Sequence, residues 1–334
     1  MNTDYLKTKK IKSIIKLYAM LIVSVFLIFP ACSQHQDIHT QIKSPAVYVP
    51  TVKEKSSAHI FAPVFMITDT SQSYDKIGSP AAHYNSDGQE EISIDINHPA
   101  MYYFKKKFKT DSGEYTNHIY RIHFPKIPVS SLTAGQNVGL MVIVTVDSSE
   151  RPVLITTVHT CGCYLAIVPT SFIQKDALPK NWNPVSQSVF GETLPGMVDY
   201  ESKSKPKLLI YLRSSVHRVA DIQIVESDTL TDINTFSMPL VPMNSLNKIP
   251  LNGSFTSFYH EKGILKGHVK GSVKYWETIF LSLISLDFFV GTDKSYINSN
   301  ETGNPFYTSL KPWNRSRSDM WHFNRFLKFW GWKL

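Results

Sequence analysis

One short segment of the sequence carries three side chains that could do chemistry together. His159, Cys161 and Cys163 lie within five residues of one another and directly follow an apolar, β-branched run. If the strand that this run predicts continues through them, all three side chains project from one face, because successive residues of a strand alternate sides. One imidazole and two thiolates on one face form a ligand set that suits Cu(I) or Zn.

The same two cysteines have two other interpretations, and the sequence leaves all three open. Alternate Cα atoms of an extended strand lie about 6.6 Å apart, near the upper limit for a disulfide, but Gly162 would allow the backbone to kink. A ring this small would be readily reduced, which suits redox chemistry. The third interpretation is simple packing of two small side chains in the core. A metal site would need a fourth ligand or an open position, and two histidines could supply the ligand, His123 and His217.

Short apolar runs bounded by turn residues predict a mainly β fold, α+β overall, with an antiparallel, sandwich-like core. The clearest pair is a hairpin from 138–146 to 153–160, whose two strands are apolar on both faces and therefore predicted to be covered on each side. The expected strands are 61–68, 92–96, 118–124, 138–146, 153–160, 164–168, 208–212 and 220–225.

The C-terminal part, residues 271–334, is predicted to be helical and packed on the same domain. Residues 272–290 contain no Gly or Pro and show helical apolar spacing, which predicts a buried amphipathic helix in preference to a membrane span. Residues 311–334 are aromatic and basic, which fits either a helix docked on the core or one that contacts a membrane or a partner. The candidate contact residues are Trp321, Arg325, Phe326, Lys328, Trp330 and Trp332.

The positive charge of the chain, +8 in total, is concentrated at its two ends. Residues 1–31 carry five lysines against one aspartate, and residues 311–334 carry six basic residues against Asp319, whereas the stretch between them holds 24 basic and 25 acidic residues. This distribution does not predict a nucleic-acid partner. The N-terminal lysines precede a 15-residue apolar run, 17–31, which is the pattern of a secretory signal peptide.

The end of that run, Phe29-Pro30-Ala31-Cys32, resembles the lipobox of bacterial lipoproteins, although Leu and a small residue are commoner in the family where Phe29 and Pro30 stand. The resemblance implies cleavage before Cys32 and acyl chains of the palmitate type on that residue. Ser33 in place of an aspartate implies the outer membrane, facing the periplasm or the exterior. Two or three acyl chains would form a stable anchor. Residues 32–59 are polar and are expected to form a flexible tether to a β-rich domain at 60–270.

The sequence contains no G-x-S-x-G elbow, H-E-x-x-H pair or phosphate-binding loop. We therefore expect an envelope lipoprotein with a non-catalytic binding role, handling a metal or a thiol–disulfide pair through residues 159–163, with the membrane and another envelope protein as partners. The alternatives are an extracytoplasmic enzyme built around the same three residues, or a structural or assembly lipoprotein in which the cysteines only pack.

Overall fold

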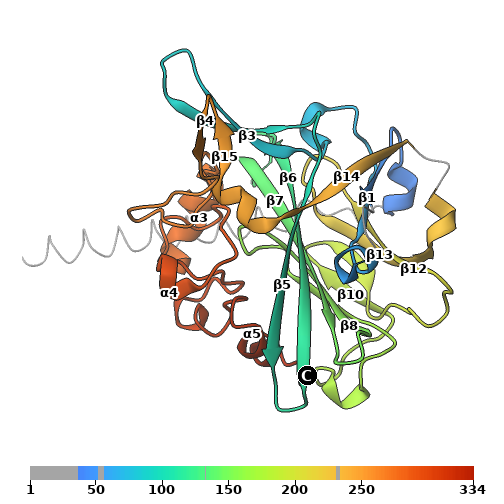
Figure 1. The fold of residues 1–334 in the computed structure, drawn as a ribbon. Coiled ribbons are helices and arrows are strands. Elements are labelled where there is room, and N and C mark those ends of the chain that lie inside the picture. Colours follow the sequence, from blue (N-terminus) through green and yellow to red (C-terminus); the bar gives the residue numbers. More distant parts are fainter. Residues whose placement is uncertain (1–36, 52–55, 132, 231–233) are drawn as a thin grey trace, which may run out of the picture. The chain divides into compact units, whose positions relative to one another are not determined.

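The computed structural model describes residues 37–51, 56–131, 133–230 and 234–334, and its main element is a ten-stranded curled sheet (Figure 1). The strands lie in the order β13-β12-β2-β1-β14-β5-β6-β7-β8-β9. Their bounds, in chain order, are β1 Ala46–Thr51, β2 Val64–Ile67, β5 Met101–Lys109, β6 Glu114–Ile127, β7 Gly135–Val146, β8 Pro152–His159, β9 Ala166–Pro169, β12 Pro206–Leu212, β13 Val219–Glu226 and β14 Thr235–Pro242.

The remaining elements are short. Three two-stranded sheets pair β3 with β4, β10 with β11, and β15 with β16. Four α-helices and several single turns complete the described chain, and three of these helices belong to the C-terminal segment. The bounds are β3 Ser79–Tyr84, β4 Glu90–Asp95, β10 Ser186–Val189, β11 Glu192–Pro195, β15 Ile249–Leu251, β16 Ser254–Thr256, α2 Ser57–Ile60, α3 Tyr275–Ser285, α4 Ser299–Thr302 and α5 Phe323–Phe329.

The predicted β-rich class is confirmed, and so is the hairpin formed by β7 and β8. The main sheet is mixed, however, and not purely antiparallel as predicted. Strand β14 runs parallel to both of its neighbours, β1 and β5, and β2 runs parallel to β12. Because β14 lies between two otherwise separate groups of strands, it joins the halves β13-β12-β2-β1 and β5-β6-β7-β8-β9.

Strand β7 shows why both faces of the predicted hairpin are apolar. Leu140, Val142 and Val144 pack into one hydrophobic core, whereas Met141 and Ile143 pack into a second core on the opposite face. Residues of the C-terminal segment cover this second core, and Figure 1 shows that segment, in orange to red, along one side of β5–β7. The sheet therefore supports packing on two sides.

The tether expected over residues 32–59 is wrong for most of the part that the structure describes. Residues 46–51 form β1, which lies inside the main sheet between β2 and β14, and Ala46, Val47 and Tyr48 are buried. The run Ala-Val-Tyr-Val-Pro-Thr is short but rich in β-formers, and both of its edges find partners. The domain therefore begins well before residue 60.

The buried helix expected over residues 272–290 is also wrong. Helix α3 is shorter, and among its residues only Ser285 is buried. Large apolar side chains such as Ile279 and Leu283 point to solvent, while Glu277 and Asp287 turn inward. Side chains of the C-terminal segment such as Phe323 and Phe326 already fill the core that α3 would otherwise cover. No helix of the described ranges has the length and apolar character needed to span a bilayer.

The aromatic tail is docked on the domain. Phe326 and Trp332 are almost fully buried, so their expected contact with a membrane or a partner is wrong. Helix α5 begins at Phe323, and Oδ1 of Asp319, four residues earlier, accepts hydrogen bonds from the backbone of Phe306 and Trp321. The aromatic side chains of the tail pack into the protein's own second core, which removes their apolar surface from water.

Candidate functional site

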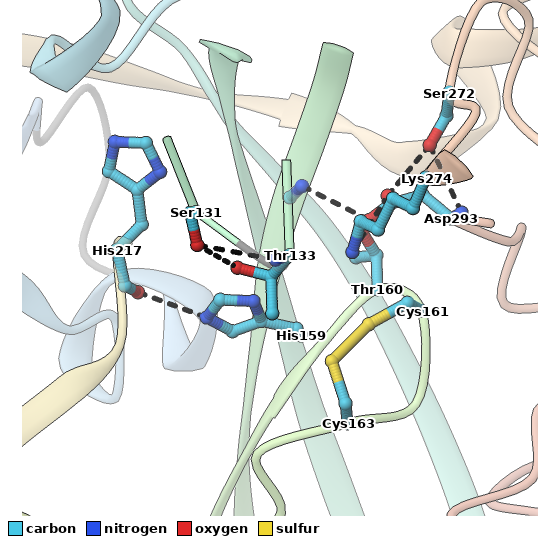
Figure 2. Close-up of a disulfide and its surroundings, with 11 residues drawn as sticks. Ser131, Thr133, His159, Thr160, Cys161, Cys163, His217, Ser272, Lys274 and Asp293 are labelled. Carbon is cyan, nitrogen blue, oxygen red and sulfur yellow. Dashed lines mark hydrogen bonds and ion pairs between the residues drawn. A yellow bond between two sulfur atoms is a disulfide. The ribbon is translucent and has the colours of Figure 1, made fainter. Parts of the chain in front are cut away.

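The site is a tight turn that follows β8. The strand ends at His159, and the chain then closes on itself through hydrogen bonds from Gly162 N to His159 O at 2.8 Å and from His159 N to Cys163 O at 2.9 Å. This turn brings the Cα atoms of Cys161 and Cys163 to 5.7 Å, and the two residues form a disulfide (Figure 2). The three predicted residues are thus brought together, but by a turn and not by alternation along a strand.

Gly162 is required at the centre of this turn for two reasons. Its φ is +92°, a conformation that residues with a side chain rarely adopt. In addition, a Cβ at this position would lie 2.1 Å from the carbonyl oxygen of Tyr307, far inside van der Waals contact. The backbone of the C-terminal segment at Tyr307 is therefore in direct contact with the disulfide turn.

His159 is buried, and burial is the main cause that lowers the pKa of its imidazole to about 3, with a smaller contribution from the charge of Lys274. The ring is therefore neutral. Its Nε2 lies 3.1 Å from the carbonyl oxygen of His217 and carries the proton in that hydrogen bond, which leaves a lone pair on Nδ1. Nδ1 is buried and has no hydrogen-bond partner in the part of the chain that the structure describes. One nitrogen of His159 and the two sulfur atoms all lie within 4.8 Å of one another.

Cys163 differs from its partner in its access to solvent. Cys161 is 5% exposed and belongs to the buried residues, whereas Cys163 is partly exposed and lines a groove of about 370 Å³. A volume of this size is in the range of small-ligand sites. The groove is lined by residues 162–165, Ile167, Trp182, residues 187–190, Thr308, Trp330 and Trp332.

Aromatic rings form much of the groove wall. The rings of Trp182 and Trp332 lie 4.9 Å apart, and so do those of Tyr164 and Phe190. Tyr164 and Phe190 both have left-handed backbones, with φ of 55° and 49°. Bulky residues adopt that conformation at an energetic cost, and such strain gathers at ligand sites. The left-handed φ of Phe190 belongs to the two-residue loop, Phe190 and Gly191, that joins β10 to β11, and the two rings lie together beside Cys163 on the groove wall.

A buried network of charged and polar groups lies on the other side of the turn (Figure 2). Asp293, which is fully buried, accepts hydrogen bonds from Thr160 Oγ1, from Gly139 N at 3.3 Å and from Ser272 Oγ at 2.7 Å. Thr160 immediately precedes Cys161 in the chain, so its hydrogen bond to the Asp293 carboxylate fixes the start of the disulfide turn.

The charge of Asp293 is balanced by Lys274, whose Nζ lies 3.5 Å from Asp293 Oδ2. Burial alone would lower the pKa of Lys274, but the carboxylates of Asp293 and Glu277 outweigh it and raise the pKa above its usual range. Lys274 is therefore a protonated ammonium in the interior. Its Nζ has no hydrogen-bond partner within normal distance among the residues of the described ranges, so the ion pair is its main compensation.

The two histidines considered as fourth ligands lie elsewhere. His217 contributes its backbone carbonyl to His159, while its ring is 3.2 Å from Asp75 and stacks on Phe124 at 4.0 Å. His123 accepts a hydrogen bond from Arg121 at 2.8 Å. Within the described residues, the group of His159, Cys161 and Cys163 contains no fourth His, Cys, Asp or Glu.

The other predicted site residues are divided between several environments. Trp330 and Trp332 line the groove, and Trp321 packs under the ammonium of Lys106, 3.3 Å from its ring centre. Arg325 and Lys328 are exposed, and Lys328 pairs with Asp111. Cys32, the expected lipidation site, lies outside the described residues.

The sequence analysis missed Lys274, Asp293 and the aromatic residues Trp182 and Phe190. These residues come from distant parts of the chain, and the fold alone brings them to the turn. The sequence signal for the groove was the concentration of tryptophans in residues 311–334, because two of the four in that segment line it.

Comparisons with known proteins give no relative from which a function could be transferred. No protein-family model matches the chain, and no curated protein or solved structure matches it at a significant level.

Proposed function

We propose that this protein is a lipid-anchored, cell-envelope thiol–disulfide protein that acts through Cys161 and Cys163. The observation that carries the proposal is the asymmetry of the pair: Cys163 faces a groove, whereas Cys161 is buried behind it. In thiol–disulfide exchange, an incoming thiolate attacks the accessible sulfur, and the other sulfur leaves. The leader and the lipobox-like Cys32 support export to a compartment where disulfides persist, at the outer membrane.

The exchange balances without any further reagent in a single turnover. A substrate thiolate attacks Cys163 Sγ, the Cys161–Cys163 bond breaks, and Cys161 leaves as a thiolate, which gives a mixed disulfide on Cys163. A second substrate thiolate then attacks the substrate sulfur of that mixed disulfide and releases Cys163. Two thiols are thereby oxidised to one disulfide, and the protein disulfide takes up two electrons.

Single cysteine variants of the full chain test this assignment. The Cys161→Ser variant should react with an aromatic disulfide reagent roughly tenfold or more faster than the Cys163→Ser variant, because only Cys163 borders the groove. Stopped-flow absorbance measures both rates, and peptide mapping by mass spectrometry identifies the labelled residue. The chain has a third cysteine, so the double variant Cys161→Ser, Cys163→Ser provides the matched background. Equal rates, or a wild-type chain whose two thiols remain reduced after export, would contradict the proposal.

A second candidate function, metal binding, is favoured by the unpartnered Nδ1 of His159. After reduction, two thiolates and this neutral imidazole would lie within 4.8 Å of one another, a set that suits Cu(I) or Zn(II) with an open fourth position. The hydrogen bond from Nε2 to the His217 carbonyl is the type of contact that orients a ligating histidine.

We expect the reduced chain to bind one Zn(II) or Cu(I) ion and the oxidised chain to bind none, because the disulfide removes both thiolates. The His159→Gln variant should weaken binding by roughly tenfold or more, since it removes a ligand and leaves both thiols. Anaerobic titration followed by native mass spectrometry measures the stoichiometry and the affinity. Equal affinity in wild type and His159→Gln would rule out the three-residue site.

A further inference from the structure

The groove beside Cys163 differs from the rest of the site because, among the described residues, no charged side chain lines it. Its polar groups are also largely occupied. Trp182 donates its Nε1–H to Gly196 O at 2.8 Å, Trp330 donates to Thr308 Oγ1 at 3.1 Å, and the Gln187 amide donates to two backbone carbonyls. What the groove offers to a ligand is therefore mainly aromatic and apolar surface.

We propose that this groove binds an uncharged polypeptide segment, with an aromatic or large apolar residue next to a cysteine. The substrate class of the site would then be cysteine-containing polypeptide and not a small anionic thiol. This inference rests on the proposed function, because the groove can select substrates only if Cys163 takes part in disulfide exchange.

The size and the position of the groove support a peptide. A volume of about 370 Å³ holds a few residues, and the walls come from four separated stretches of chain, around residues 162–167, 182–190, 308 and 330–332. Offset and edge-to-face contacts with aromatic rings stabilise a bound aromatic side chain beyond the effect of its buried area. Tyr164 and Phe190, which contact each other, and Trp330, which is 40% exposed, offer such rings in the groove.

The nearby charges do not favour a small anionic thiol. Lys274 is fully buried in its pair with Asp293 and does not itself line the groove; its charge reaches the groove only through its effect on the buried Tyr164 hydroxyl. Arg218, whose guanidinium lies 5.7 Å from the centre of the Tyr164 ring, is 3.1 Å from Glu192. A carboxylate brought into the groove would lose water without gaining a cation, which is costly.

The placement of Tyr164 and Phe190 next to Cys163 also supports the proposal. Phe190 is presented at the two-residue loop of the β10–β11 hairpin, where a positive φ is required. Both rings lie on the groove, in contact with each other, and Tyr164 immediately follows the reactive cysteine in the chain. A side chain next to the substrate cysteine would therefore contact these two rings.

The test uses the oxidised full chain and short peptides that differ only in the residue before a central cysteine, phenylalanine or glutamate. The peptide thiolate forms a bond to Cys163 Sγ, and Cys161 leaves as a thiolate. Acid-quenched mass spectrometry measures the rate of mixed-disulfide formation. We expect the phenylalanine peptide to react roughly tenfold faster than the glutamate peptide. In the Trp330→Ala variant this ratio should fall towards one.

The matched control is Trp313→Ala, which removes a tryptophan that is 75% exposed and does not line the groove. It should keep the wild-type ratio. Equal rates for the two peptides, together with normal reduction of the protein by dithiothreitol, would overturn the groove proposal and leave the exchange function standing. A disulfide that resists both peptides and dithiothreitol would instead overturn the exchange function itself.

Discussion

The Asp293→Ala variant should lose about 3–5 kcal/mol of unfolding free energy, because it leaves the buried ammonium of Lys274 without its partner. It also removes the acceptor of three hydrogen bonds, from Thr160, Ser272 and the backbone of Gly139. Urea unfolding followed by tryptophan fluorescence measures the loss.

Two further variants make this result interpretable. Asp111→Ala breaks an exposed ion pair with Lys328 and should change stability by less than about 1 kcal/mol. The double variant Lys274→Met, Asp293→Ala removes both charges and should be more stable than Asp293→Ala alone. If Asp293→Ala costs no more than Asp111→Ala, then the buried network does not hold the disulfide turn as described.

Lowering the pH from 7 to 5 should destabilise the domain by several kcal/mol, even before its carboxylates are protonated. Burial lowers the pKa of both His118 and His268 to about 4, and it lowers the pKa of His123, His159 and His217 in the same direction. An unfolded chain takes up these protons near pH 6.5, whereas the folded domain does not take them up until the pH is much lower.

The sign of the effect follows from this difference in proton uptake. Stability is fully present above the unfolded pKa and is lost as the pH falls from about 6.5 towards 4, by about 2 kcal/mol for each of His118 and His268 between pH 7 and pH 5. Urea unfolding at the two pH values measures the change. In the His268→Asn variant, which keeps a donor for the Leu265 carbonyl, the loss should be about 2 kcal/mol smaller. A stability that is constant between pH 7 and pH 5 would contradict this account.

Features of the fold that depend on neighbouring residues could be predicted from the sequence. The β7–β8 hairpin was predictable because both strands and their turn lie within one continuous stretch. Both faces of each strand are apolar, so the burial of both faces was predictable as well. The failures concern partners that are distant in the chain. Taken by themselves, residues 46–51 resemble part of a flexible tether. They form strand β1 only because β2 and β14 pair with its two edges.

The candidate site divides in the same way. The cluster of His159, Cys161 and Cys163 could be found from spacing, and Gly162 indicated the kink that brings the cysteines together. Neither the groove nor the buried ammonium of Lys274 could be predicted, because each requires chain segments more than a hundred residues from the turn. The tail was identified by its tryptophans, but only the structure shows that it packs against the domain.

The position of β14 has a consequence for how the chain acquires its structure. Each half of the main sheet contains antiparallel pairs, and β5 to β9 are joined by consecutive local connections that form quickly. Strand β14 instead pairs Val47 with Thr235 and Met101 with Leu240, so it closes two very long loops at once. Until it is in place, β1 and β5 are unpaired edges that can pair with other chains. A protein exported as an unfolded chain would therefore depend most on chaperones during the interval before this strand joins the two halves.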